Sequence, residues 1–222
     1  MKVQLWRRAV GGTRTLVGHR HDEWPYWGAV TYSGEARAGD TVVIVGVGGI
    51  GINAVQGAAA VGAEHIVAVD PVAFKRQKAL EFGATHAVAT SDEAAALLAE
   101  LTRGQLAQVC VNTMGIGEGD QIAASLALVG KRGRVVVTNL HRATEMQVAM
   151  SALDLTLFEK QVRGSLFGSS NPRADIPRML EMYRSGNLKL EELRTRTYSL
   201  DDINAGYDDL RNGRNLRGVI TF

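Results

Sequence analysis

Short apolar runs alternate along the chain with longer segments in which apolar residues recur at helical spacing. The run at residues 41–45 lies between Gly39-Asp40 and Gly46. Its four consecutive apolar residues are typical of a strand buried on both faces of a parallel sheet. Runs of the same kind predict further strands at residues 65–69, 86–89, 108–111, 134–138 and 217–222.

The segments between these runs have the length and the periodic composition of helices. We expect helices at residues 50–61, 74–82, 93–101 and 120–128, the second of them ended by Gly83. Strands that alternate with helices of about ten residues indicate βαβ units and a parallel sheet with helices on both faces. The predicted fold class is therefore α/β, a Rossmann-type doubly wound parallel sheet.

The end of the chain has a different pattern, which predicts a C-terminal α+β extension. Asp175 is expected to cap a helix that runs to about Arg184. Ser199 and Asp202 have the spacing of a capping box, which predicts a second helix that ends near Gly213. The terminal apolar strand completes this extension.

Three units follow from these patterns: residues 1–26, a Rossmann-type domain at residues 27–167 and the extension at residues 168–222. The first unit lacks a sustained period and places several lysines and arginines before its first acidic residue, Asp22. No apolar stretch follows them, as a secretory or twin-arginine signal would need. We therefore expect a basic leader that is poorly ordered.

Composition is that of an ordinary globular protein, since 45% of the 222 residues are hydrophobic and 22% are charged. Lys and Arg number 25 against 23 Asp and Glu, so the net charge favours neither nucleic acid nor an anionic membrane as partner. No apolar run approaches the ~18 residues of a membrane span. Cys110 is the only cysteine, which excludes an intramolecular disulfide and a cysteine-rich zinc site and favours a reducing, cytoplasmic location.

Residues 46–51, Gly-Val-Gly-Gly-Ile-Gly, contain the pattern Gly-x-Gly-x-x-Gly directly after a predicted strand and at the start of a predicted helix. In a dinucleotide-binding fold, Gly46 allows the sharp turn, Gly48 lets the backbone approach a pyrophosphate, and Gly51 lets the helix pack closely on the strand. The helix N-terminus offers open N–H groups and a positive dipole end to the phosphates. The alternative is a glycine-rich turn that serves packing alone.

Asp70 ends the second strand, 19 residues after Gly51, where an acidic residue accepts hydrogen bonds from the ribose hydroxyls of a dinucleotide. A carboxylate at this position repels a 2′-phosphate, so NAD(H) is favoured over NADP(H). The tyrosine-lysine pair of short-chain dehydrogenases, four residues apart, does not occur in the sequence. The sequence therefore predicts that residues 27–167 form an NAD-binding domain.

Four segments of the sequence carry a resemblance to a known family. They are GVGGIGINAVQGA (46–58), VAVDPVAFKRQKALEFGATH (67–86), GSLFGSSNPRADIP (164–177) and INAGYDDLRNGRNLRGVITF (203–222). In these segments the chain resembles the medium-chain, zinc-type alcohol dehydrogenases, and within them the nicotinoprotein, nitrosodimethylaniline-dependent group. The resemblance extends from Trp27 to Phe222 and corresponds to the C-terminal, cofactor-binding part of those enzymes.

The resemblance implies cofactor contacts at matching positions. Lys75, Thr113 and Arg217 would lie on the adenosine and pyrophosphate side, and Asn139 and Phe167 would border the nicotinamide. For Lys75 and Arg217 the alternative is a solvated surface charge. The full set of implied cofactor contacts is Gly46, Gly48, Gly49, Ile50, Gly51, Asp70, Lys75, Thr113, Met114, Asn139, Leu140, Phe167 and Arg217.

The family also implies a catalytic zinc, whose cysteine-containing ligand set we do not find in this sequence. His21 matches the position of one zinc cysteine, so His19 and His21 are candidate metal ligands, with exposed leader side chains as the alternative. His141 follows the fifth strand and is the candidate catalytic residue, as a proton shuttle, with a solvent-facing loop histidine as the alternative. Because zinc lowers the pKa of a bound hydroxyl, we expect weak or no turnover from this chain alone.

In the family, the edge strand at about residues 161–167 pairs across a two-fold axis, which implies a homodimer. Apolar residues of the extension would either repack on the cofactor domain or pair with another chain. Two functions remain open, beside a third possibility, a truncated gene product with no independent role. The first is an NAD-binding oxidoreductase that acts on a small alcohol or aldehyde by hydride transfer. The second is a non-catalytic NAD-binding or assembly module, or half of a split enzyme.

Overall fold

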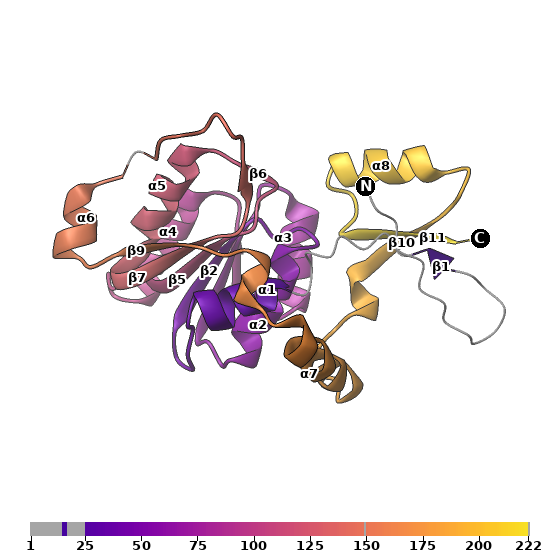
Figure 1. Cartoon of the computed structure of the whole chain (residues 1–222), viewed down its shortest axis with the longest axis horizontal. Helices are drawn as coiled ribbons and strands as arrows, with labels where there is room; N and C mark the ends of the chain where they lie inside the picture. The colour runs from indigo at the N-terminus through magenta and orange to yellow at the C-terminus, as the bar shows by residue number, and fades with distance from the viewer. Residues whose placement is uncertain (1–14, 17–24, 149, 222) are drawn as a thin grey trace.

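The structure, a computed structural model, describes residues 15–16, 25–148 and 150–221. Six of the described strands form one parallel sheet in the order β4-β3-β2-β5-β7-β9 (Figure 1). The strands are β2 (Thr41–Val45), β3 (His65–Val69), β4 (His86–Val88), β5 (Ala107–Asn112), β7 (Val129–Val137) and β9 (Gln161–Gly164). The order reverses at β2, as in a doubly wound sheet, so the predicted fold class is confirmed.

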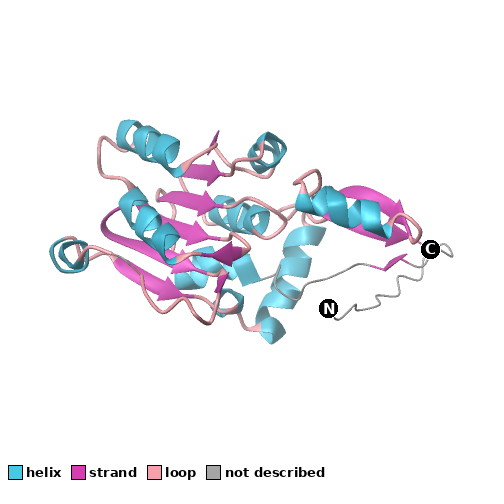
Figure 2. Cartoon of the chain, turned by 90° about the horizontal axis from the view of Figure 1, so that it is seen from above, coloured by secondary structure: helices cyan, strands magenta, loops and turns pink. Residues whose placement is uncertain are grey.

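Helices cover both faces of this sheet (Figure 2). The helices are α2 (Gly51–Ala60) and α3 (Ala73–Glu81) on one face and α4 (Ser91–Leu101) and α5 (Gly119–Leu128) on the other. Because successive side chains of a strand point to opposite faces, β2 supplies Val42 and Ile44 to the first core and Val43 and Val45 to the second. Among the described residues, none of the helices has the length and hydropathy to cross a membrane.

The four predicted helices of the Rossmann-type domain agree with the observed ones to within two residues at each end. α4 starts at Ser91 because the Thr90 hydroxyl caps it by accepting a hydrogen bond from Glu93 N (3.2 Å). β7 is longer than the predicted strand at residues 134–138, since it begins directly after α5. The polar residues Lys131 and Arg132 interrupt the apolar pattern in its first half.

β9 is the edge strand of the sheet, as predicted, although its regular part ends at Gly164. It is preceded by α6 (Ala152–Leu157), a helix that the sequence analysis missed because six residues are too few for a periodic signal. We call the exposed large apolar side chains of α6, of the residue that follows it and of the loop after β9 the β9 margin: Leu153, Leu155, Leu157, Phe158, Leu166 and Phe167.

The C-terminal extension forms a second, smaller sheet (Figure 1, yellow). It lies beside the Rossmann-type domain at residues 27–167, which we call the body. β11 (Arg217–Thr221) pairs in parallel with β10 (Arg194–Ser199) and in antiparallel fashion with β1 (Thr15–Leu16). α8 (Ile203–Arg211) connects β10 to β11 and ends before Gly213, as predicted. β1 belongs to the segment predicted as a leader, and the rest of that segment up to residue 24 lies outside the described residues.

α7 (Pro172–Arg184) begins earlier than predicted. The side chain of Asn171 accepts a hydrogen bond from the backbone N–H two residues later (3.2 Å), and Pro172 follows at the first helical position, where its missing N–H has no intrahelical role. Asp175, predicted as the cap, lies instead inside the first turns of the helix. Its buried carboxylate accepts hydrogen bonds from the Tyr32 hydroxyl (2.5 Å) and from Asn171 N (2.7 Å), which ties α7 to the body.

Some apolar side chains of the extension repack on the body, and others stay open. Leu188 packs with Trp27 and Met179 in a small core, and Leu193 is completely buried in the core beneath α2. Leu210 on α8 is 56% exposed. The first part of the extension is therefore packed on the body through buried apolar side chains, whereas α8 leaves an apolar side chain exposed.

Candidate functional site

A cavity of about 600 Å³ opens at the carboxyl ends of β2, β3 and β5, where the strand order reverses. Open α/β sheets bind their ligands at such a point. The glycine-rich turn, the end of β3 and the loop after β5 form its walls. The predicted cofactor residues that line it are Gly46, Gly48, Gly49, Ile50, Asp70, Lys75, Thr113 and Met114.

The glycine-rich turn needs glycine at two positions for steric reasons. Gly46 has a φ of +89°, in the left-handed region that side chains disfavour. A Cβ on Gly51 would lie 1.9 Å from the carbonyl oxygen of Gly46, so α2 can start here only without a side chain. At Gly48 no atom of the part of the chain that the structure describes lies within 4 Å of the position of a Cβ, and Gly48 lines the cavity.

Hydrogen bonds connect the carboxyl ends of β2, β3 and β5. Gly46 N donates to Val69 O (2.7 Å), and Thr113 N donates to Val45 O (2.9 Å). The Thr113 hydroxyl donates to the carbonyl oxygen of Gly46. The turn between β2 and α2 is thereby held against the ends of both β3 and β5.

Asp70 lies at the wall of the cavity with only 4% of its surface exposed. Its Oδ2 accepts a hydrogen bond from Val47 N (3.0 Å), and its Oδ1 accepts one from Val72 N (2.9 Å). An ionised carboxylate has about four acceptor positions, so each oxygen keeps one for a ligand. Lys75, in the first turn of α3, brings a positive charge to the same cavity.

Polar side chains that the sequence analysis did not single out complete the walls. Thr90 follows β4, and Gln121 and Ser125 belong to α5. The Ser125 hydroxyl donates to Asn112 Oδ1 (2.8 Å) at the end of β5. The topology could have indicated them, because segments that follow parallel strands meet at one edge of the sheet.

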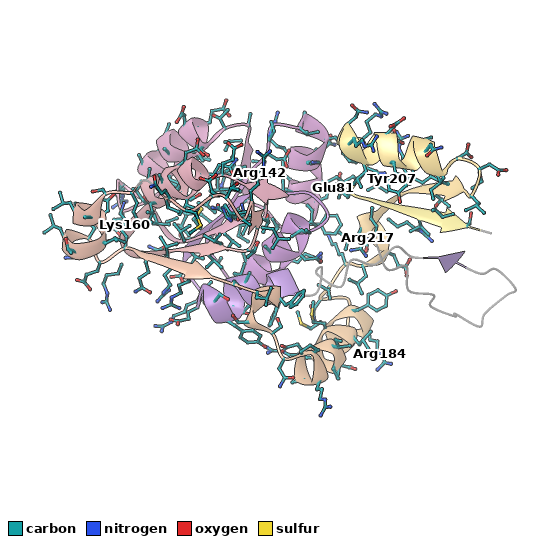
Figure 3. All side chains as sticks on the ribbon, turned by 45° about the horizontal axis from the view of Figure 1, so that its top comes forward. Glu81, Arg142, Lys160, Arg184, Tyr207 and Arg217 are labelled. Carbon is teal, nitrogen blue, oxygen red and sulfur yellow. The ribbon has the colours of Figure 1, made fainter. Side chains whose placement is uncertain are left out.

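The remaining predicted cofactor residues lie outside the lining of this cavity: Gly51, Asn139, Leu140, Phe167 and Arg217. Leu140 is 75% exposed, and Phe167 is 53% exposed on the loop after β9. Arg217 starts β11, and Figure 3 shows it on the side of the extension nearest the body. Its neighbour Leu216 contacts the glycine-rich turn, since a Cβ on Gly49 would lie 3.0 Å from Leu216 O.

Asn139 and His141 form a polar pair beyond the end of β7, where β6 (Ile116–Gly117) pairs with β8 (Leu140–His141). The amide nitrogen and oxygen of Asn139 and the Nε2 of His141 are buried, and no described residue hydrogen-bonds to them. A Cβ on Gly117 would lie 1.9 Å from Asn139 Nδ2 and 2.6 Å from His141 Nε2. His141 is therefore half-buried beside Asn139, and buried polar atoms without protein partners call for a ligand or water.

Among the described residues, no three His, Cys, Asp or Glu side chains lie close enough together to hold a metal ion. Burial raises the pKa of the Cys110 thiol to about 12, so the thiol stays protonated at neutral pH. The candidate ligands His19 and His21 lie outside the described residues.

Residues 49–185 match the family described as zinc-binding dehydrogenase. The NDMA-dependent alcohol dehydrogenase of Amycolatopsis methanolica is 54% identical over 194 residues, which cover 87% of this chain and 52% of that protein. The putative alcohol dehydrogenase D of Mycobacterium tuberculosis (strain ATCC 25618 / H37Rv) is 53% identical over 194 residues, which cover 53% of its length. The chain thus spans about half the length of the curated relatives it matches.

Solved structures show the same similarity of fold. Benzyl alcohol dehydrogenase from Acinetobacter calcoaceticus superposes with a TM-score of 0.81 at 25% identity, over 90% of this chain and 54% of that one. An alcohol dehydrogenase zinc-binding domain protein from Burkholderia ambifaria superposes with a TM-score of 0.81 at 26% identity, over 90% of this chain and 53% of that one.

Proposed function

The chain belongs to the zinc-binding dehydrogenase family, and on this premise we propose that residues 27–167 bind NAD(H) in an oxidoreductase acting on a small alcohol or aldehyde. The cavity at the ends of β2, β3 and β5 is the observation that carries the proposal. Relatives named as alcohol dehydrogenases support the substrate class. The single buried cysteine supports a reducing, cytoplasmic location.

The glycine-rich turn is suited to the pyrophosphate of the dinucleotide. Among the described residues, no atom lies within 4 Å of the position of a Cβ on Gly48, so a phosphate can approach the backbone closely. In the described chain, the N-cap residue Ile50 makes no side-chain hydrogen bond to the first turn of α2, which leaves its open N–H groups to an anionic ligand. Lys75 and Arg217 are the cations that we assign to the phosphates and the adenosine ribose.

Asp70 is suited to the two ribose hydroxyls of the adenosine half. Its carboxylate is fixed by the backbone N–H groups of Val47 and Val72, and it keeps acceptor positions for both hydroxyls. A buried negative charge at this point disfavours the additional phosphate of NADP(H). Asp70 therefore supports NAD(H) as the cofactor.

Asn139 and His141 are suited to the nicotinamide half. The unpaired amide of Asn139 offers both a donor and an acceptor, which complement the carboxamide of nicotinamide. Bound NAD(H) would supply the hydride acceptor or donor of the reaction. We assign to His141 Nε2 the movement of a proton, since an imidazole nitrogen can accept a proton and donate it again. Leu140 and Phe167 would provide apolar contacts beside the same ring.

An NADH fluorescence titration with an Asp70→Ala variant tests the cofactor assignment. We expect saturable binding at micromolar NADH and a loss of about tenfold or more in the variant, because the lost ribose contacts are worth about 1.5–3 kcal/mol. Asp70→Asn keeps one acceptor oxygen and should lie between the two. Asp92→Ala, which removes an exposed carboxylate on α4, is the matched control and should bind like the unmodified chain.

Equal NADH affinity in Asp70→Ala and the unmodified chain would contradict the assignment. Alcohol-dependent formation of NADH by the unmodified chain would support the oxidoreductase. NADH binding without such turnover would favour the alternative, a non-catalytic NAD-binding or assembly module.

We also propose that the chain forms a homodimer through the β9 margin. β9 is an edge strand with open hydrogen-bonding groups, and apolar side chains such as Leu166 (74% exposed) surround it. Light scattering should give a mass of twice 23.9 kDa at micromolar concentration. Leu166→Lys should give the monomer mass, whereas Leu210→Lys on α8 should leave the dimer intact. A monomer for the unmodified chain would contradict this proposal.

A further inference from the structure

A second cavity, of about 590 Å³, lies between the Rossmann-type body and the extension. Phe74 and Lys78 of α3 form one side of it. The other side comes from the short helix η3 (Glu191–Leu193), from β10 and from the loop that precedes β11. Figure 3 shows the end of α3, marked by Glu81, facing α8, marked by Tyr207.

Basic side chains from three separate elements meet in this cavity: Lys78, Arg194, Arg196 and Arg214. Among the described residues that line it, Glu192 is the only acidic one. Lys78 also contacts Glu81 at the surface (2.7 Å), a pair that solvent weakens. The lining therefore carries an excess of positive charge.

The carboxylate of Asp209 on α8 holds two of these arginines, Arg196 and Arg214, in place. Its Oδ2 accepts a hydrogen bond from Arg196 Nη1 (2.8 Å), and its Oδ1 accepts one from Arg214 Nε (2.6 Å). The hydrogen bonds from Arg214 and from the Tyr198 hydroxyl hold the pKa of Asp209 below its ordinary value of 3.8, so the carboxylate is ionised at neutral pH. One carboxylate balances only one of the two guanidinium charges.

The two arginines keep most of their hydrogen-bonding capacity. Each guanidinium has five N–H donors, and the contact with Asp209 uses one of them. Their side chains are 51% and 52% exposed, on the side that lines the cavity. Their positions are thus fixed before any ligand arrives, which lowers the entropy lost on binding.

We propose that this cavity binds the phosphate groups of a phosphorylated small molecule. Planar guanidinium groups bind phosphate oxygens in a bidentate manner, and several cations favour a ligand with more than one negative charge. The volume falls within the ~300–1,000 Å³ of small-molecule pockets, which leaves room for an organic group against Phe74. The proposal does not depend on the NAD(H) assignment.

α3 separates this cavity from the cofactor cavity, and a short loop contacts both sides. Lys75 lines the cofactor cavity, and Arg214 lines the second one. Gly213 lies between them with a φ of +66°, where a Cβ would lie 3.1 Å from Val72 Cγ2 and 3.4 Å from Lys75 Cε. The two cavities are therefore adjacent but have separate lining residues.

Isothermal titration calorimetry of the full chain with inorganic pyrophosphate at 0.15 M salt tests the proposal. Lys78→Gln/Arg194→Gln removes two cations of the second cavity and leaves the Asp209 cluster intact. We expect this variant to bind pyrophosphate about tenfold or more weakly than the unmodified chain, because it loses charge-assisted hydrogen bonds. Arg184→Gln removes an exposed arginine on α7 and is the matched control, with no change expected.

Pyrophosphate could also bind the glycine-rich turn, so Gly48→Val serves as the second arm. A Cβ at this position meets no described atom within 4 Å, so the added side chain should occupy the open side of the cofactor cavity and abolish NADH binding while pyrophosphate binding persists. Pyrophosphate binding that is lost only in Gly48→Val, or lost equally in Arg184→Gln, would overturn the proposal. Neither result changes the NADH titration of the unmodified chain and Asp70→Ala. The phosphate site and the NAD(H) site are therefore tested independently.

Discussion

The Rossmann-type body and the C-terminal extension are stabilised by different forces. In the body, all five residues of β2 are buried, and four of them fill apolar cores on both faces of the sheet. In the extension, β10 exposes most of its residues, and its Arg196 and Tyr198 converge with Arg214 on the carboxylate of Asp209. The stabilisation from apolar burial is non-directional and insensitive to pH. The stabilisation from a cluster of ion pairs depends on the protonation of its groups and on the geometry of its hydrogen bonds.

Two matched valine truncations should show the largest difference between the regions. Val111 in β5 is completely buried, and Val219 in β11 is 3% exposed. Val111→Ala should lower the free energy of unfolding by about 2–3 kcal/mol, since it removes two buried methyl groups and leaves a cavity at the centre of the sheet. Urea denaturation of both variants measures this difference.

Val219→Ala should change the global unfolding transition less and act mainly on the extension. Hydrogen exchange followed by mass spectrometry should show faster exchange in β10 and β11 and unchanged exchange in β2. If both truncations lowered the unfolding free energy equally and exchange rose in both sheets, body and extension would form one cooperative unit.

The sequence predicted the main strands and helices of the body and α7, α8 and β11 of the extension, but it missed β10 for a physical reason. β2 and β3 are visible as apolar runs because a strand buried on both faces excludes polar side chains. β10 alternates arginine with threonine, and only its pairing with β11 makes it a strand. Such a strand has no local signal, since its stabilising contacts lie elsewhere in the chain.

The candidate sites differ in the same way. The glycine-rich turn and Asp70 are close in sequence and have a recognisable spacing, so they could be predicted. Gln121 and Ser125 reach the cavity only because α5 packs beside it. The convergence on Asp209 joins β10, α8 and the following loop, and no short motif encodes it.

Asp209→Asn should weaken the extension without altering the body. The substitution removes the negative charge that attracts Arg196 and Arg214, and it leaves both guanidinium groups without the carboxylate that they share. We expect faster hydrogen exchange in β10 and β11 with protection of β2 and β5 unchanged. Asp208→Asn is the matched control, because Asp208 is exposed and, among the described residues, its carboxylate pairs with Arg211 on the same helix (3.7 Å). An equal effect of both substitutions would exclude a special role for Asp209.

Acidification should give the smallest and most local effect. The pKa of Asp209 is lowered in the folded state, so its contribution to stability is complete above the ordinary aspartate pKa of 3.8 and is lost as the pH falls through the lower, folded value. Methyl NMR signals of Val219 should therefore change below about pH 4, before those of Val111 do. Simultaneous loss of both signals would contradict this order.

The two backbone hydrogen bonds that Asp70 accepts set a limit on redesign of the cofactor preference. A change from NAD(H) to NADP(H) would call for a small or basic residue at this position. Such a residue would also release the N–H groups of Val47 and Val72, which shape the turn and the start of α3. Such a redesign would therefore need new hydrogen-bond acceptors for these two N–H groups at the same time. The residue proposed to select the ribose also holds the surrounding backbone in place.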